Sequence, residues 1–317
     1  MSKRFQLAGV GLLIALVFYF LGGKTARYDG GGQVRQGNYQ FTNPLLECNV
    51  SGISAPKKNF EKSVAKLIDQ MLRDGLIKHA AFYYRDLNNG PVFGLNHQDT
   101  YFPGSLGKLP LAMAIYKMAE SRPSVLSEKI VYDNFETPPA GLEYISTSTV
   151  LSIGESYRLE ELIDLMLRYS DNQAAFLLYT YADKRELDTI YQFLGIDGDV
   201  LTANKDGQIG VRQYSSFLRI LYNASYLSGE NSNTILKTLS RAEFTEGLRA
   251  GVPTSIPIAN KFGIAESQAG LPQMHDCGII YVPNKPYLLC IMTEGNRLEQ
   301  LYEAIAKISA LVYQERD

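Results

Sequence analysis

The chain has 317 residues, of which 45% are hydrophobic and 20% are charged, so it can bury a core of ordinary globular size. Its formal net charge of −2 at pH 7 gives no electrostatic indication of nucleic-acid binding, and we expect no nucleic-acid partner. The three cysteines are an odd number, and the three histidines (His79, His97 and His275) stand apart in the sequence. We therefore expect neither a disulfide framework nor a metal site, and we predict no cofactor.

The N-terminal residues 1–26 predict a membrane anchor. Lys3 and Arg4 precede an uncharged, largely apolar segment over residues 5–23. At 1.5 Å per residue this segment would be about 28 Å long as a helix, which is enough to cross a bilayer core. A cleaved signal peptide is the alternative, although the residues around 22–26 make a poor cleavage site. Either interpretation places the remainder outside the cytoplasm. Residues 27–59 are rich in Gly, Asn, Gln and Ser and predict a flexible linker.

The folded part is predicted to begin at Phe60, with an amphipathic helix over 60–76. A β-hairpin follows over 80–86 and 92–95, joined at Asn88-Asn89-Gly90. A helix then runs from Ser105 to about residue 120, and no strand pair is predicted between there and residue 246. Further helices are predicted at 159–169, 173–181, 184–193, 211–225 and 233–239.

The last part of the chain returns to strands. The period of the hydrophobic pattern predicts a strand over 255–265, a hairpin over 277–282 and 287–293, and a closing helix over 297–314. A sheet with terminal helices is thus built from both ends of the folded part. We predict an α/β part from 60–104 and 250–317, an all-α part from 105–249, and a site in the cleft between them.

Cys277 and Cys290 lie on the two strands of the last predicted hairpin. A two-residue turn at Asn284-Lys285 would place residue 279 opposite Cys290 and leave Cys277 diagonal to it, too distant for a bridge. Although a bridge is possible in principle, we predict two buried cysteines that act as small hydrophobic residues.

The sequence Ser105-Leu-Gly-Lys108 follows Pro103-Gly104 at the start of a predicted helix. Residues three apart share a helix face, so the amine of Lys108 can reach the hydroxyl of Ser105. A serine needs such a base to act as a nucleophile, and a helix N-terminus supplies N–H groups to a developing charge. The pattern suits acyl transfer. Two further Ser-x-x-Lys matches, at Ser54 and Ser63, are interpreted as linker and exposed helix surface.

Two more short motifs carry polar groups. Ser170-Asp171-Asn172 separates two predicted helices; it is either a helix cap or a pair of substrate-facing groups, with Ser170 relaying a proton and Asn172 gripping an amide. Lys261-Phe262-Gly263 lies on a predicted strand. There Lys261 can attract an anionic substrate group, and Gly263 can let the substrate backbone approach the strand.

Together, and in this order, Ser-x-x-Lys, Ser-Asp-Asn and Lys-x-Gly resemble the signature of class A β-lactamases and penicillin-binding proteins. The resemblance extends from about Phe60 to the C-terminus. It implies a β-lactamase/transpeptidase-like fold: an antiparallel sheet flanked by helices from both chain ends, with an inserted helical subdomain. It also implies an acyl-enzyme on Ser105, Lys108 as the activating base, Ser170 and Lys261 as proton shuttle and carboxylate ligand, Asn172 as amide ligand, and the N–H groups of Ser105 and Ile264 as oxyanion hole.

The sequence departs from the family at two places. The Ω-loop glutamate that the β-lactamases use for deacylation has no counterpart, because no glutamate occurs between Glu186 and Glu230. Asp206 is the best substitute, ahead of Asp197 and Asp199. Phe262 stands where the family carries a Thr or Ser hydroxyl.

Three functions follow from the resemblance and from these departures. We expect slow hydrolysis of β-lactams by a membrane-anchored enzyme. A D,D-carboxypeptidase or endopeptidase acting on peptidoglycan stem peptides would use the same residues. A non-catalytic, membrane-tethered module that binds the cell envelope is the alternative of another class.

Overall fold

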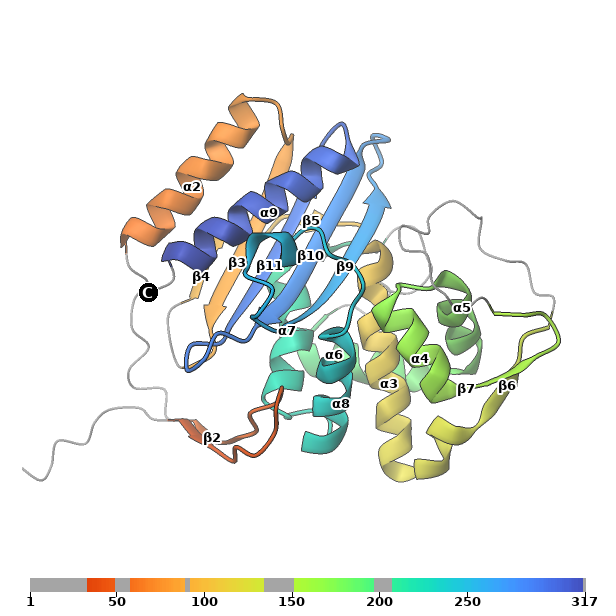
Figure 1. Ribbon diagram of the computed structural model, residues 1–317. Coiled ribbons are helices and arrows are strands. Elements are labelled where there is room, and N and C mark those ends of the chain that lie inside the picture. The colour runs from red at the N-terminus through yellow and green to blue at the C-terminus, as the bar shows by residue number, and fades with distance from the viewer. Residues whose placement is uncertain (1–32, 49–57, 89–91, 134–150, 197–206, 316–317) are drawn as a thin grey trace, which may run out of the picture.

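A computed structural model describes residues 33–48, 58–88, 92–133, 151–196 and 207–315. A five-stranded antiparallel sheet runs through one half of the molecule, with its strands in the order β4-β3-β11-β10-β9 (Figure 1). Its strands are β3 (His79–Asp86), β4 (Val92–Leu95), β9 (Ile258–Glu266), β10 (Pro272–Ile280) and β11 (Tyr287–Glu294).

Helices from the two ends of the folded part cover one face of this sheet. They are α2 (Lys58–Arg73) and α9 (Leu298–Glu315), which lie side by side in Figure 1. Val64 of α2 and Ile305 of α9 are completely buried among the apolar residues of this face. Because both helices bury a stripe spaced three to four residues apart, they pack as the sequence predicted. The predicted fold class is confirmed.

The helical part lies against the other face of the sheet. Helix α3 runs through its centre and buries ten of its 14 residues, so most of its surface lies in the core. Helix α7 packs on β3, β10 and β11 and thereby joins the two parts. The helices are α3 (Lys108–Ser121), α4 (Leu159–Arg168), α5 (Asn172–Tyr181), α6 (Lys184–Leu194), α7 (Val211–Tyr222) and α8 (Gly229–Leu239), with the short 3₁₀ segments η1 (Gly104–Gly107), η2 (Pro123–Ser127) and η4 (Arg249–Gly251).

Within the predicted folded part, which begins at Phe60, two short strand pairs were not predicted. β6 (Lys129–Val131) pairs with β7 (Ser156–Arg158), and β5 (Thr100–Tyr101) pairs with β8 (Ile209–Gly210). The prediction of no strand pair between 120 and 246 is therefore wrong for β6 and β7. Strands of two or three residues are too short to show an alternating pattern, so the sequence gives no signal for them.

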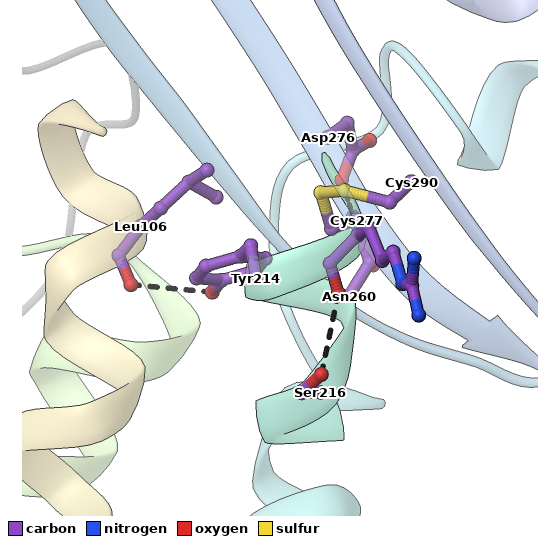
Figure 2. The surroundings of a disulfide bond; sticks show 8 residues. Leu106, Tyr214, Ser216, Asn260, Asp276, Cys277 and Cys290 are labelled. Carbon is purple, nitrogen blue, oxygen red and sulfur yellow. Dashed lines mark hydrogen bonds between the residues drawn. A yellow bond between two sulfur atoms is a disulfide. The ribbon is translucent and has the colours of Figure 1, made fainter. Parts of the chain in front are cut away.

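Cys277 and Cys290 form a disulfide (Figure 2), which corrects the prediction of two unpaired cysteines. The register pairs Ile280 with Tyr287, and the Lys285 N–H donates to the Val282 carbonyl oxygen at 3.0 Å. The two-residue turn therefore lies at Pro283-Asn284, one residue earlier than the turn assumed from the sequence. This register places Cys277 directly opposite Cys290, with their Cα atoms 3.9 Å apart. Both are fully buried, in the face of the sheet that α7 covers.

Part of the predicted linker is folded onto the domain. β1 (Gln33–Arg35) pairs with β2 (Leu45–Cys48), and between them Phe41 is 5% exposed, with its ring 5.1 Å from that of Tyr281 in an edge-on arrangement. The guanidinium of Arg35 donates to the Leu87 carbonyl and to Asn223 Oδ1. The prediction of a flexible linker over 27–59 is therefore wrong for residues 33–48, because the Phe41 ring and the Arg35 guanidinium hold them against the domain.

The predicted membrane anchor lies outside the described residues. Within the described part of the chain, no helix has the length and apolar character that a membrane span requires.

Candidate active site

Ser105 lies in a tight turn that is pressed against strand β9. Gly104 has a φ of +51°, and a Cβ added there would lie 2.1 Å from the Ile264 carbonyl oxygen. A Cβ on Gly263 would lie 2.5 Å from the Pro103 carbonyl oxygen. Glycine is therefore required on both sides of this contact, which fixes Ser105 beside the strand.

The role predicted for Gly263 is different from the one the structure shows. We expected the substrate backbone to approach this glycine, but the chain's own turn, at Pro103 and Leu106, fills the space beside it. Gly263 thus lets the turn that carries Ser105 pack directly against strand β9.

Lys108, the first residue of α3, is 5% exposed and surrounded by oxygen atoms. Its Nζ donates to Asn172 Oδ1 at 2.6 Å, to Ser170 Oγ at 3.2 Å and to the Ser170 carbonyl oxygen. These three oxygen acceptors hold the amine at the start of α3, beside Ser170 and Asn172.

The Ser170-Asp171-Asn172 motif combines both interpretations that its sequence allowed. Asp171 is the N-cap of α5, and its Oδ1 accepts a hydrogen bond from the Ala174 N–H at 2.7 Å. Ser170 has a φ of +59°, unusual for a residue other than glycine, and this conformation turns its hydroxyl and carbonyl toward the lysines. The cap therefore holds the two functional side chains in place.

Lys261 of β9 is the second amine at Ser170. It is 1% exposed, and its Nζ donates to Ser170 Oγ and to the Phe262 carbonyl oxygen, both at 2.9 Å. Burial, and secondly the neighbouring charge of Lys108, lower the pKa of Lys261 well below that of a free lysine, while Asp276 of β10 acts in the opposite direction. The Ser170 hydroxyl thus lies between two amines. Protonating both would cost free energy, because their like charges repel.

Phe262 replaces the expected hydroxyl with an aromatic ring. The ring is stacked on Phe244 at a centroid distance of 4.1 Å, and Lys261 Nζ lies 4.3 Å from its centroid. A ring face at this distance favours the cationic form of an amine, so it partly offsets the cost of burying Lys261.

A cavity of about 210 Å³ opens at these groups. Most of the predicted site residues line it, and Lys261 is bonded to Ser170 immediately behind its wall. No carboxylate is among the described lining residues, which are Gly104, Ser105, Lys108, Tyr169, Ser170, Asn172, Tyr179, Phe262 and Ile264. The candidates for a deacylating base, Asp197, Asp199 and Asp206, lie outside the described residues.

Two tyrosines of this lining, Tyr169 and Tyr179, are not among the site residues predicted from the sequence. Tyr179 OH donates to the Gly107 carbonyl oxygen at 3.4 Å, and burial raises the pKa of Tyr179 to about 12, which keeps the phenol neutral. Tyr169 directly precedes the Ser170-Asp171-Asn172 motif, so its position in the sequence could have indicated that it lies at the site. No sequence signal indicated Tyr179, because it is one of many apolar or aromatic residues in α5. Among the described residues, no cluster of three or more His, Cys, Asp or Glu could hold a metal ion.

A serine at a helix start, a buried lysine one turn later and a second serine between two lysines are the parts of an active-site-serine hydrolase. Residues 60–316 match the family model described as "Beta-lactamase enzyme family", and the chain belongs to this family. No curated protein matches the chain.

Solved structures share the fold at low sequence identity. The structure of PBP-A is 20% identical, with a TM-score of 0.68, over 83% of this chain and 98% of its own. A β-lactamase from Chitinophaga pinensis DSM 2588 is 19% identical, with a TM-score of 0.70, over 82% and 100%. A class A β-lactamase from Mycobacterium abscessus is 21% identical, with a TM-score of 0.64, over 80% and 98%.

Proposed function

We propose that the protein is an active-site-serine hydrolase that forms an acyl-enzyme on Ser105 with β-lactams or D-alanyl peptides. The observation that carries this proposal is the Ser170 hydroxyl, which lies between Lys108 and Lys261 at the wall of the cavity that Ser105 lines. A nucleophile needs a proton acceptor, and a leaving group needs a proton donor; a bridged pair of amines can serve as both.

The chemistry begins with attack by Ser105 Oγ on the carbonyl carbon of the substrate amide. The proton of Ser105 passes to an amine of the pair, with Lys108 as the activating base, one helical turn from the serine. The tetrahedral oxyanion would be held by the N–H groups of Ser105 and Ile264. Ser170, in contact with both amines, would then return a proton to the leaving nitrogen.

Lys261 and Asn172 would bind the substrate. Asn172 Oδ1 is held by Lys108, which leaves its amide N–H group for a substrate carbonyl. Lys261 would donate an N–H group to the substrate carboxylate, which a neutral amine can also do, although Phe262 lacks the hydroxyl that would share this role.

We propose that release of the acyl group is slow. The described lining of the cavity contains no carboxylate to activate water, and Asp206 has a short side chain. A variant of the similar PBP-A has been solved as an acyl-enzyme complex with penicillin G. Similarity to PBP-A favours a second candidate function, that of a peptidoglycan D,D-carboxypeptidase or endopeptidase, with the same residues.

We also propose that the N-terminal residues 1–26 anchor the protein in the cell membrane by a single span, with the catalytic domain outside the cytoplasm. The apolar segment 5–23 supports this placement. The Cys277–Cys290 disulfide supports it too, because disulfides persist in oxidising compartments. Protease accessibility of the domain in intact spheroplasts tests it.

The intact mass of the full chain, followed over time with benzylpenicillin, tests the proposed chemistry. A persistent adduct that is absent from the Ser105→Ala variant supports slow release. An adduct that appears and disappears as the penicillin is consumed supports true β-lactamase turnover. Release of D-alanine from a D-Ala-D-Ala peptide supports the carboxypeptidase. The absence of any adduct and of D-alanine release would leave only a non-catalytic envelope-binding module.

A further inference from the structure

A second cavity, of about 460 Å³, lies between α7 and the sheet, and it shares no lining residue with the active-site cavity. Three arginines open into it: Arg85 from β3, and Arg212 and Arg219 from α7. The rest of its lining is mainly polar. It comprises Tyr83, His97, Gln98, Thr100, Leu194, Gly210, Gln213, Ser215, Ser216 and Leu288.

The packing of α7 on the sheet brings the three arginines together. Arg212 and Arg219 are seven residues apart, or about two turns, so they point from the same face of α7. Arg85 is paired with Leu288 across β3 and β11, on the face of the sheet that α7 covers. The arginines therefore face one another across the cavity.

Among the described residues, none of the three guanidinium groups forms a salt bridge. No Asp or Glu is among the described residues that line the cavity. Burial, and then the charges of Arg85 and Arg212, lower the pKa of Arg219. Gathered, partly buried like charges destabilise a fold unless something compensates for them.

A buried hydroxyl adds a second, independent feature. Ser215 lies on the same face of α7, is 2% exposed, and its Oγ has no hydrogen-bond partner in the described structure. A buried hydroxyl without a partner costs free energy, which a ligand oxygen in the cavity would recover.

We infer that this cavity binds a small molecule carrying two or three clustered negative charges, of the diphosphate or tricarboxylate type. Three guanidinium groups offer many N–H donors, which match the oxygens of such an anion in paired hydrogen bonds. A neutral ligand would leave the charge uncompensated, and the cavity is large enough for an anion with an attached organic group.

The test is isothermal titration of the full chain with pyrophosphate and, separately, with citrate, at an ionic strength held constant with sodium chloride. Thermal unfolding is measured with and without each anion. The variants are Arg219→Gln and Ser215→Ala, and Arg185→Gln is the matched control, because Arg185 is exposed and lies outside the cavity. The tighter-binding anion distinguishes a diphosphate ligand from a tricarboxylate one.

Saturable binding is expected in the wild type and in Arg185→Gln, with affinity lowered about tenfold or more in Arg219→Gln. Without anion, Arg219→Gln is expected to unfold at a higher temperature than the wild type, because it relieves the repulsion. That result shows that the variant is folded. Ser215→Ala should weaken binding less. The inference is overturned if neither anion binds, or if Arg219→Gln and Arg185→Gln bind equally well.

Discussion

Lys108 and Lys261 approach one oxygen atom, Ser170 Oγ, at 3.2 and 2.9 Å, and they come from different parts of the molecule. Lys108 begins the central helix of the helical part, and Lys261 lies on the edge strand β9 of the sheet. The seam between the two parts therefore holds two amines, and their positive charges repel each other when both are protonated. Their titration is coupled, so a proton gained by one makes it harder for the other to be charged.

The first prediction concerns the bridge itself. Ser170→Ala removes the hydroxyl but leaves Lys108 its contacts with Asn172 and with the residue 170 carbonyl oxygen. Acylation by a penicillin should slow by about 10²- to 10⁴-fold, the range of a lost proton relay. The measurement is the second-order rate of adduct formation by mass spectrometry. Ser240→Ala is the control and should react like the wild type, because Ser240 is a half-buried serine whose hydroxyl donates to the Lys237 carbonyl oxygen, one turn earlier in α8. A Ser170→Ala rate within threefold of the wild type would contradict the relay.

The second prediction concerns pH. Because the pKa of Lys261 is lowered, its amine is neutral at pH values where a free lysine is charged, and lowering the pH protonates it. Acylation should therefore fall as the pH falls through this lowered pKa. Lys261→Arg keeps a permanent charge, since a guanidinium does not lose its proton in proteins.

The pH profile of the acylation rate, measured for both proteins, checks this prediction. In Lys261→Arg, the rate at neutral pH should be strongly reduced, and the acid limb should no longer lie at its wild-type position. An unchanged profile would show that Lys261 takes no part in the proton transfer.

The groups at this seam are predictable from the sequence because each belongs to a short motif with its own chemistry. Ser105, Ser170 and Lys261 were placed at a turn, between two helices and on a strand, and the structure brings them together there. Periodic elements were likewise predictable, because α2 and α9 carry apolar residues at helical spacing.

What could not be predicted depended on contacts distant in sequence. The disulfide follows from the register of β10 and β11, which the position of their turn sets. The turn lies at Pro283-Asn284, one residue before the Asn284-Lys285 turn assumed from the sequence. Folding of residues 33–48 depends on Phe41 and Arg35 meeting Tyr281 and Asn223, and polar composition around them gave no sign of it. Tyr179 enters the active-site cavity only through the packing of α5.

The third prediction tests whether Gly263 positions the nucleophile. A Cβ there would lie 2.5 Å from the Pro103 carbonyl oxygen and 2.8 Å from Leu106 Cγ, so the turn that carries Ser105 must shift. Misplacement of a reacting group by about 1 Å costs on the order of 10²-fold in rate. Gly263→Ala should therefore acylate much more slowly while remaining folded.

Gly278→Ala is the matched control on the same strand pair. Its Cβ would meet Asn260 Cβ at 2.6 Å, away from the Ser105 turn, so it should lower the unfolding temperature without slowing acylation of the folded protein. If both variants lost activity equally, sheet damage rather than positioning would explain the loss.

The fourth prediction concerns the disulfide. Cys277 and Cys290 are 13 residues apart, and a cross-link closing a loop of this size stabilises a fold by about 3 kcal/mol through the entropy of the unfolded chain. The double variant Cys277→Ala/Cys290→Ala should lose a similar free energy of unfolding in guanidinium denaturation. Adding a reductant should destabilise the wild type toward the variant but leave the variant unchanged. Equal stability of the oxidised and reduced wild type would argue against the bridge.

The fifth prediction tests whether residues 33–48 belong to the folded domain. Phe41 is 5% exposed against Tyr281, whose hydroxyl donates to the Phe41 carbonyl oxygen at 2.9 Å. Truncating a buried phenylalanine costs about 3 kcal/mol or more, so Phe41→Ala should lower the free energy of unfolding by that amount. Gln40→Ala, an exposed neighbour, should change it little. A flexible tether would make both substitutions neutral, so equal stability of the two variants would return this segment to the linker. A loss confined to Phe41→Ala would mean that any truncated protein used for kinetics must begin before Gln33.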